Sequence, residues 1–156
     1  MTRYYLPSSL LSISFAGKYC IYRKRYQCPA GMSSGDVFWD DEDKWNSNRL
    51  GGTLPDGTYN TKTWIFFCCK TDGNKDNPIL LPSKSPFFLL AYNSTKCQMV
   101  KRAVATLEWI YFDTDDWDNQ DQADGAYPHD AGKSPPIIYY CYYRGEKNTS
   151  LCKLHL

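Results

Sequence analysis

The chain has 156 residues and a mass of 18.0 kDa, a size that fits one domain burying about 70% of its unfolded surface and argues against two independent domains. Its 18 basic and 17 acidic side chains give a formal net charge of +1, so the charge balance favours neither nucleic acid nor an anionic membrane as a partner. We also expect no membrane span, because no apolar run approaches about 18 residues.

The first predicted element lies within residues 10–23. Apolar side chains there alternate loosely, with Phe15, Tyr19 and Ile21 on one parity, which indicates one or two strands. Residues 10–16 are shorter than most signal-peptide cores and follow a flank with a single basic side chain. We therefore expect a strand of the mature chain here rather than an intact signal peptide.

Two further strands are predicted in the first half. Val37-Phe38-Trp39 is a short apolar strand that ends at an acidic turn, residues 39–43. Glycine, proline and asparagine then punctuate a polar connection between residues 51 and 60. Residues 63–69 give the strongest strand prediction, since β-branched and aromatic side chains fill every position before a pair of cysteines.

The second half follows the same order. Three prolines keep residues 78–86 extended, and residues 87–90 then predict a strand. Residues 100–111 fit either a short helix or a strand, and their β-branched and aromatic content favours the strand. A second acidic turn, residues 113–119, precedes the last predicted strand, residues 135–143.

The two halves repeat each other at an offset of 73 residues, over about thirty positions without a gap. Residues that match at this offset are Asp40 with Asp113, Gly52 with Gly125, Pro55 with Pro128 and Cys68 with Cys141. We therefore predict an all-β domain at 13–143, an antiparallel sandwich or barrel of two pseudo-repeated halves stapled by disulfides. The halves cover about 13–72 and 80–143, between an N-terminal segment (1–12) and a C-terminal tail (144–156).

The seven cysteines indicate disulfides in an oxidising compartment, because they lack both CxxC spacing and the nearby histidines of a zinc site. Two N-glycosylation sequons, Asn93-Ser94-Thr95 and Asn148-Thr149-Ser150, agree with this interpretation. We therefore expect a secreted, extracellular protein.

The repeat also suggests how the cysteines pair. If the halves fold alike, each has one bridge between equivalent positions, worth roughly 4 kcal/mol in the chain-entropy model. The predicted bridges are Cys28–Cys68, Cys97–Cys141 and Cys20–Cys69, the last joining two cysteines whose places in the second half are taken by Leu89 and Tyr142. Cys152 is left free or joins another chain. The alternative register, Cys28–Cys69 with Cys20–Cys68, stays open.

The acidic turns are candidates for a metal site. Dense carboxylate oxygens suit calcium, although neither turn has the spacing of an EF-hand. The proposed calcium ligands are Asp40, Asp41, Asp43, Asp113, Asp115 and Asp116. The alternative is that these side chains cap turns and pair with lysine or arginine, and a third reading is direct polar contact with a ligand. No cofactor is expected to be required.

Tryptophans inside the acidic loops are candidates for a glycan site. Binding of a sugar or a muramyl peptide needs an aromatic face together with amide and carboxylate partners. The proposed ligand-binding residues are Trp45 and Trp117 for stacking, with Asp43, Asp116, Asn46, Asn119 and His129 as polar partners. The alternative is that the tryptophans cover the end of a sandwich.

Catalysis is the contrasting hypothesis. Glu42 or Glu108 with Asp113 could form the carboxylate pair of a glycoside hydrolase, but any one pair among so many turn carboxylates has little support. The chain also lacks a nucleophile-elbow motif and a Gly-rich phosphate loop. We therefore expect no enzyme. An adhesive or extracellular-matrix role is a further alternative, suggested by Cys152 as a bridge between chains.

Five motifs in order give the chain a family resemblance: Gly17-Lys18-Tyr19-Cys20, Cys28-Pro29-Ala30-Gly31, Trp39-Asp40-Asp41-Glu42-Asp43, Cys68-Cys69 and Tyr140-Cys141-Tyr142. Over about residues 13–143 the chain resembles the apextrin C-terminal domain, ApeC. It departs from the family pattern at Phe15-Ala16, where an aromatic-proline pair is usual, and at Cys152. The resemblance implies a secreted or surface protein of invertebrate innate immunity or development. It further implies non-enzymatic, lectin-like pattern recognition of microbial surfaces, particularly of peptidoglycan.

Overall fold

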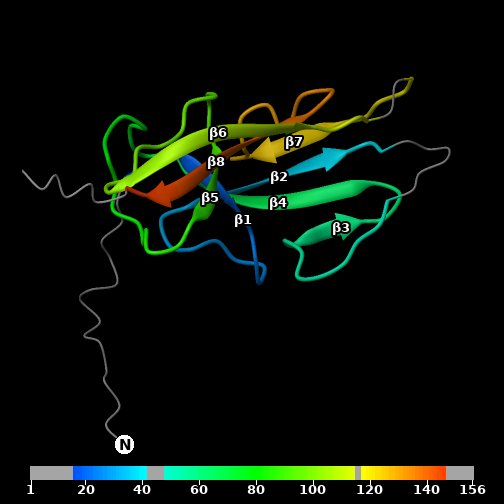
Figure 1. Cartoon of the computed structure of the whole chain (residues 1–156). Helices are drawn as coiled ribbons and strands as arrows, with labels where there is room; N and C mark the ends of the chain where they lie inside the picture. The colour runs from blue at the N-terminus through cyan, green and yellow to red at the C-terminus, as the bar shows by residue number, and fades with distance from the viewer. Residues whose placement is uncertain (1–15, 42–47, 115–116, 147–156) are drawn as a thin grey trace, which may run out of the picture.

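The computed structural model describes residues 16–41, 48–114 and 117–146. Their regular structure consists of strands (Figure 1): β1 Tyr19–Tyr22, β2 Ser33–Trp39, β3 Gly57–Tyr59, β4 Thr63–Lys70, β5 Phe87–Ala91, β6 Ala103–Tyr111, β7 Gln122–Gly125 and β8 Ile137–Gly145. The predicted all-β class is confirmed, and β6 shows that the strand was the right choice within residues 100–111. In the described part of the chain, no helix has the length and apolarity needed to cross a membrane.

The strands form one antiparallel sheet in the order β6-β8-β5-β1-β4-β2-β7, with β3 beside β4. The end strands β6 and β7 are not paired with each other, so the sheet is open rather than a closed barrel. It is strongly curled, because Val37 of β2 and Ile138 of β8 belong to one buried cluster although three strands separate them in the sheet. The predicted sandwich or barrel is therefore a single sheet curled around its own core.

The internal repeat is visible in the sheet. The order β2-β4-β1 in the first half is mirrored by β6-β8-β5 in the second. The cross-strand pair Val37–Ile65 corresponds at the offset of 73 to the pair Ile110–Ile138. Gly52 and Gly125 also share a left-handed backbone, with φ of 75° and 67°. The acidic turns thus follow equivalent strands in two related halves.

Three disulfides connect the expected pairs: Cys20–Cys69, Cys28–Cys68 and Cys97–Cys141. The alternative register is wrong because Cys20 lies directly opposite Cys69 across β1 and β4, while Cys68 faces the other side of the sheet. Cys152 lies outside the described residues. The loops that these bridges close span 49, 40 and 44 residues, and each bridge is worth about 4 kcal/mol by loop entropy.

One detail of the predicted repeat is wrong by a residue. Tyr142 stands opposite Phe88 and not Leu89, and the rings of Tyr142 and Phe88 lie 5.0 Å apart. The strand pairing shows that Phe88 occupies the place of Cys20, because the spacing between β1 and β5 differs by one residue from the sequence estimate. An aromatic contact in the second half therefore stands where the first half has a disulfide.

The sheet buries a cluster of side chains on each face. The inner cluster fills the curl and includes Val37, Phe67 and Ile138, all fully buried. The outer cluster includes Leu89 and Tyr143 and is covered by the connection between β5 and β6 together with residues 75–79. Both faces of the central strands are thus covered. Space for a ligand is left on the inner face, next to the inner cluster.

A candidate ligand-binding groove

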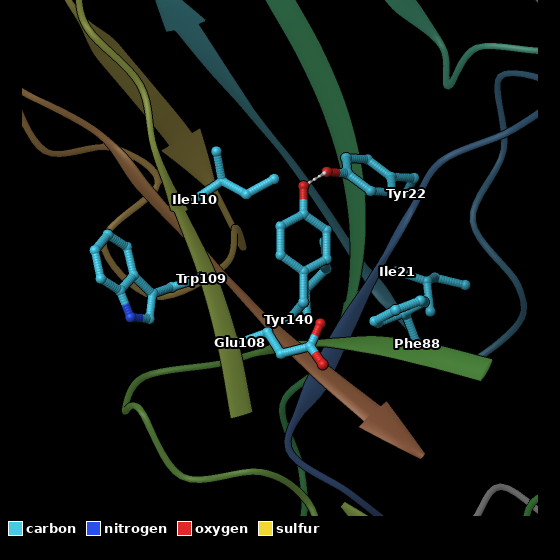
Figure 2. A pocket seen from close by; sticks show the side chains of 8 residues that line it. Ile21, Tyr22, Phe88, Glu108, Trp109, Ile110 and Tyr140 are labelled. Atoms are coloured by element: carbon cyan, nitrogen blue, oxygen red, sulfur yellow. Dashed lines mark hydrogen bonds between the residues drawn. The ribbon is translucent and has the colours of Figure 1, made fainter. Parts of the chain in front are cut away.

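The inner face of the sheet contains a hollow of about 530 Å³ next to the inner cluster (Figure 2). We call it the aromatic hollow. Its walls come from β1, β5, β6 and β8: Ile21, Tyr22, Phe88, Leu90, Glu108, Trp109, Ile110 and Tyr140. Strand alternation directs Glu108 and Ile110 to the inner face and Trp109 to the other side of β6. Phe88 is 51% exposed, so its ring is available to a ligand.

Two tyrosines form a polar point inside this apolar wall. The hydroxyls of Tyr22 and Tyr140 are hydrogen-bonded to each other at 2.9 Å. Burial raises the pKa of both phenols, so both hydroxyls stay neutral at physiological pH. A neutral hydroxyl can donate or accept, which suits the hydroxyl and amide groups of a sugar.

A second hollow of about 460 Å³ adjoins the first, since Tyr22 lines both. We call it the acidic-turn hollow, and the two together the groove. Its walls combine aromatic, apolar and polar side chains: Tyr22, Trp39, Asp41, Asn48, Arg49, Pro55, Tyr59, Thr63, Ile65, Phe112 and Asp113. Arg49 is exposed and makes no ion pair with any described residue. The groove therefore offers ring faces, an amide, carboxylates and one guanidinium.

The two acidic turns meet at this hollow. Trp39 and Phe112, which are equivalent in the repeat, pack against each other with tilted rings whose centroids lie 4.5 Å apart. Asp40 is buried, pairs with Lys62 and accepts a hydrogen bond from the backbone N–H of Gln120 at 2.9 Å. The hydrogen bond from Lys62 is the main reason that the pKa of Asp40 is lowered. Asp40 thus holds the turns together, as the structural alternative expected.

Asp41 and Asp113 line the acidic-turn hollow. Asp41 accepts hydrogen bonds from Thr63 Oγ1 at 2.6 Å and from Asn48 Nδ2 at 2.9 Å. Burial nevertheless raises the pKa of Asp41, so it ionises less readily than an exposed aspartate. The carboxylate of Asp41 therefore lines the hollow in an orientation that Thr63 and Asn48 hold fixed.

The calcium hypothesis stays a prediction. Within residues 16–41, 48–114 and 117–146, no three His, Cys, Asp or Glu side chains gather as a metal site would require. The remaining proposed ligands, Asp43, Asp115 and Asp116, lie outside the described residues, and Asp40 is engaged by Lys62.

The predicted glycan-binding residues are divided among different places. Trp117 is 95% exposed, and Asn119 organises its turn by donating to Thr114 Oγ1 at 2.8 Å and accepting from Asp121 N–H at 2.8 Å. His129 lies in a separate hollow that shares no lining residue with the groove. The other proposed residues, Trp45, Asn46, Asp43 and Asp116, lie outside the described residues.

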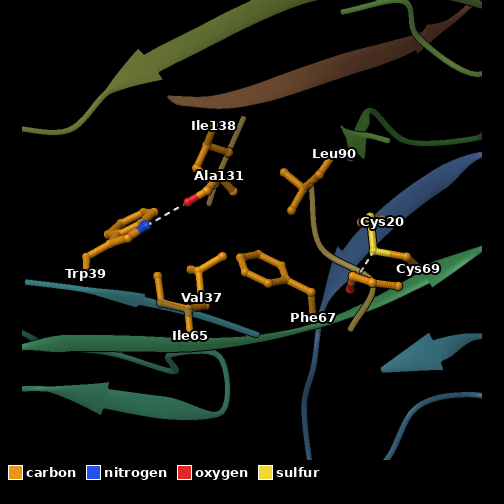
Figure 3. Close-up of a cluster of buried hydrophobic side chains, with 10 residues drawn as sticks. Cys20, Val37, Trp39, Ile65, Phe67, Cys69, Leu90, Ala131 and Ile138 are labelled. Carbon is orange, nitrogen blue, oxygen red and sulfur yellow. Dashed lines mark hydrogen bonds between the residues drawn. A yellow bond between two sulfur atoms is a disulfide. The ribbon is translucent and has the colours of Figure 1, made fainter. Parts of the chain in front are cut away.

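The aromatic hollow exists because the two halves differ at Gly35, whose equivalent in the second half is Glu108. Segment 126–131 belongs to the second half of the sequence but crosses the inner face of the first half's strands. There Ala131 is buried, and its carbonyl accepts a hydrogen bond from Trp39 Nε1 at 2.9 Å (Figure 3). A Cβ on Gly35 would lie 2.2 Å from the carbonyl oxygen of Ala126. Only glycine leaves room for this segment.

The second half lacks this filling. Glu108 and Ile110 stand where the first half has Gly35 and Val37, and both line the aromatic hollow. The segment equivalent to 126–131 is 53–58, which instead leads into β3 beside β4. In the first half, segment 126–131 fills the space over the inner face. The aromatic hollow is the equivalent space in the second half, and no equivalent segment fills it.

Sequence reasoning missed Tyr22, Phe88 and Tyr140 as site residues and considered Glu108 only as a catalytic carboxylate. The signal in the sequence was the replacement of Gly35 by Glu108 within the repeat. That replacement shows that the halves differ, but only the path of the chain shows that the difference leaves a hollow.

The fold and the groove define an all-β, disulfide-stapled domain of two related halves with an aromatic groove on its inner face. The family described as the C-terminal domain of apextrin, ApeC, matches residues 11–143. The chain belongs to this family, as the resemblance predicted. We found no match to the chain among curated proteins or among solved structures.

Proposed function

We propose that the chain is a secreted innate-immune recognition module that binds bacterial cell-wall glycan, either peptidoglycan or muramyl peptide, without catalysis. The observation that carries the proposal is the junction of the two hollows at Tyr22. One hollow is mainly aromatic and apolar, and the other carries an amide, carboxylates and Arg49. A muramyl peptide has the same two parts, since it joins sugar rings to a lactyl-peptide that ends in a carboxylate.

Each part of the groove has a specific task in this proposal. Phe88 and the tyrosines pack against the C–H faces of the sugar, and Arg49 pairs with a peptide carboxylate. Asn48 and Asp41 take amide and hydroxyl groups between them. Secretion is supported by the three disulfides, which persist in oxidising compartments.

The proposal is tested by retention on insoluble peptidoglycan and by titration with a soluble muramyl peptide. We expect Phe88→Ala to weaken binding about threefold to tenfold, from the loss of an aromatic contact, and Arg49→Ala to weaken it about tenfold. The control is Tyr26→Ala, which removes an aromatic side chain that is 83% exposed and lies outside the groove. Equal affinity for all four proteins would refute the groove as the site.

The loop tryptophans are tested in the same assay. Loss of retention in Trp45→Ala or Trp117→Ala, with full retention in Phe88→Ala, would move the site from the groove to the tips of the acidic turns. The absence of catalysis is tested with labelled peptidoglycan. We expect no soluble label, and its release at a rate above background would replace binding by hydrolysis.

A further inference from the structure

A second surface feature lies at the end of β5. Asn93 directly follows Tyr92 in an exposed turn and has a φ of 55°, a left-handed conformation that asparagine tolerates. It begins the sequon Asn93-Ser94-Thr95, whose middle residue is not proline. No hydrogen bond between described residues uses the Asn93 side chain. Its amide is therefore accessible in the folded protein.

Beside Asn93 lies the hollow that contains His129, with a volume of about 380 Å³. Tyr92, Tyr127 and Lys133 also line it. Its polar centre is Asp130, which pairs with Lys133 at 2.8 Å and lies 3.5 Å from His129. Tyrosine rings around a polar centre suit an N-acetylglucosamine unit, because its C–H face can pack on a ring while its acetamide and hydroxyls form hydrogen bonds.

We propose that Asn93 carries an N-linked glycan whose first N-acetylglucosamine lies in this hollow. The donor is a lipid-linked oligosaccharide pyrophosphate in the secretory pathway. The bond that forms joins Asn93 Nδ2 to C1 of the sugar, and the bond that breaks joins C1 to the pyrophosphate oxygen. The amide loses one proton to the transferase base, the lipid pyrophosphate leaves, and nothing is oxidised or reduced.

The place of the glycan is compatible with the proposed groove. The hollow at Asn93 shares no lining residue with either part of the groove. A glycan there covers His129 and leaves Phe88 and Arg49 open to a ligand. The inference rests on passage through the secretory pathway and not on the identity of the ligand, so it can fail while the groove proposal stands.

The experiment expresses the full chain behind a heterologous signal peptide in cultured eukaryotic cells. Asn148→Gln is the background, because Asn148 begins the other sequon and lies outside the described residues. We expect a mass increase of one glycan that peptide-N-glycosidase removes, with an Asn-to-Asp conversion mapped to position 93. Thr95→Ala should abolish the increase and Thr95→Ser should retain it. An oxidised, secreted protein with unmodified Asn93 would overturn the proposal.

The position of the first sugar is tested by NMR on the glycoprotein trimmed to one N-acetylglucosamine. We expect nuclear Overhauser contacts between the acetamide methyl group and the ring protons of Tyr92 or Tyr127. A sugar attached at Asn93 without such contacts would refute its placement in the hollow. Tyr127→Ala is the matched control: the glycan should stay attached, and the nuclear Overhauser contacts to the Tyr127 ring should disappear.

Discussion

The two halves differ at Gly35, whose equivalent in the second half is Glu108. Substitution of Gly35 gives the sharpest test of how segment 126–131 packs on the inner face. In Gly35→Ala, the added methyl carbon would lie 2.2 Å from the carbonyl oxygen and 2.3 Å from the nitrogen of Ala126. Both atoms belong to the backbone, so no flexible side chain can move away. The segment after β7 must shift, and the hydrogen bond from Ala126 N–H to the Ser34 carbonyl, 3.1 Å long, is strained or lost.

The expected magnitude follows from three contributions. Overpacking a well-filled site costs about 1–3 kcal/mol, and losing one hydrogen bond costs about 1 kcal/mol. Replacing glycine by alanine restricts the unfolded chain, which offsets about 0.4–1 kcal/mol. We therefore expect Gly35→Ala to lower the free energy of unfolding by about 2 kcal/mol, within a range of about 1–4 kcal/mol.

Urea unfolding with the disulfides intact, followed by tryptophan fluorescence, measures this change. The matched control is Glu108→Ala at the equivalent position, which is exposed and should change stability by no more than about 0.5 kcal/mol. A Gly35→Ala protein as stable as the wild type would refute the reasoning that segment 126–131 fills the first half and leaves the second half open.

Three further predictions concern the bridges and the acidic turns. Replacing Cys97 and Cys141 together by serine should lower the free energy of unfolding by about 4 kcal/mol, and an unchanged urea midpoint would contradict this. Asp40→Asn should lower the free energy of unfolding by about 2 kcal/mol, because Lys62 and the N–H of Gln120 lose their ionised acceptor. Equal urea midpoints of the wild type and Asp40→Asn at pH 7 would refute the structural role of Asp40. Since the pKa of Asp40 is lowered in the folded state, its contribution is complete above the ordinary aspartate pKa of about 3.9 and is lost as the pH falls through the lowered value. The stabilities of the wild type and Asp40→Asn, measured by urea midpoints, should therefore converge as the pH falls below about 3.9, whereas a constant difference would contradict the ion pair.

Much of the scaffold could be predicted from the sequence because the long strands have strong local signals. Residues 63–69 and 135–143 are rich in β-branched and aromatic side chains, and they form β4 and β8. The offset between the halves led to the three disulfides. The short strands β3 and β7 were missed, because each contains glycine and has at most four residues, so only pairing with a neighbour holds it in place.

The candidate site was less predictable, because it depends on contacts between distant parts of the chain. The dense carboxylates of the acidic turns suggested a metal site, yet Asp40 forms an ion pair with Lys62 from the connection between β3 and β4. Phe88 looks like an ordinary strand residue in the sequence, and its exposure beside Tyr140 follows from the route of segment 126–131. Local patterns do not encode which half receives such a crossing segment.

The most direct test of the groove is an NMR titration of the isotope-labelled protein with a soluble muramyl peptide. We expect chemical-shift changes to concentrate on Tyr22, Phe88, Glu108 and Tyr140 in the aromatic hollow, and on Arg49 in the acidic-turn hollow. Shifts confined to the turn of Trp117 or to the hollow of His129, or no shifts at saturating ligand, would contradict it.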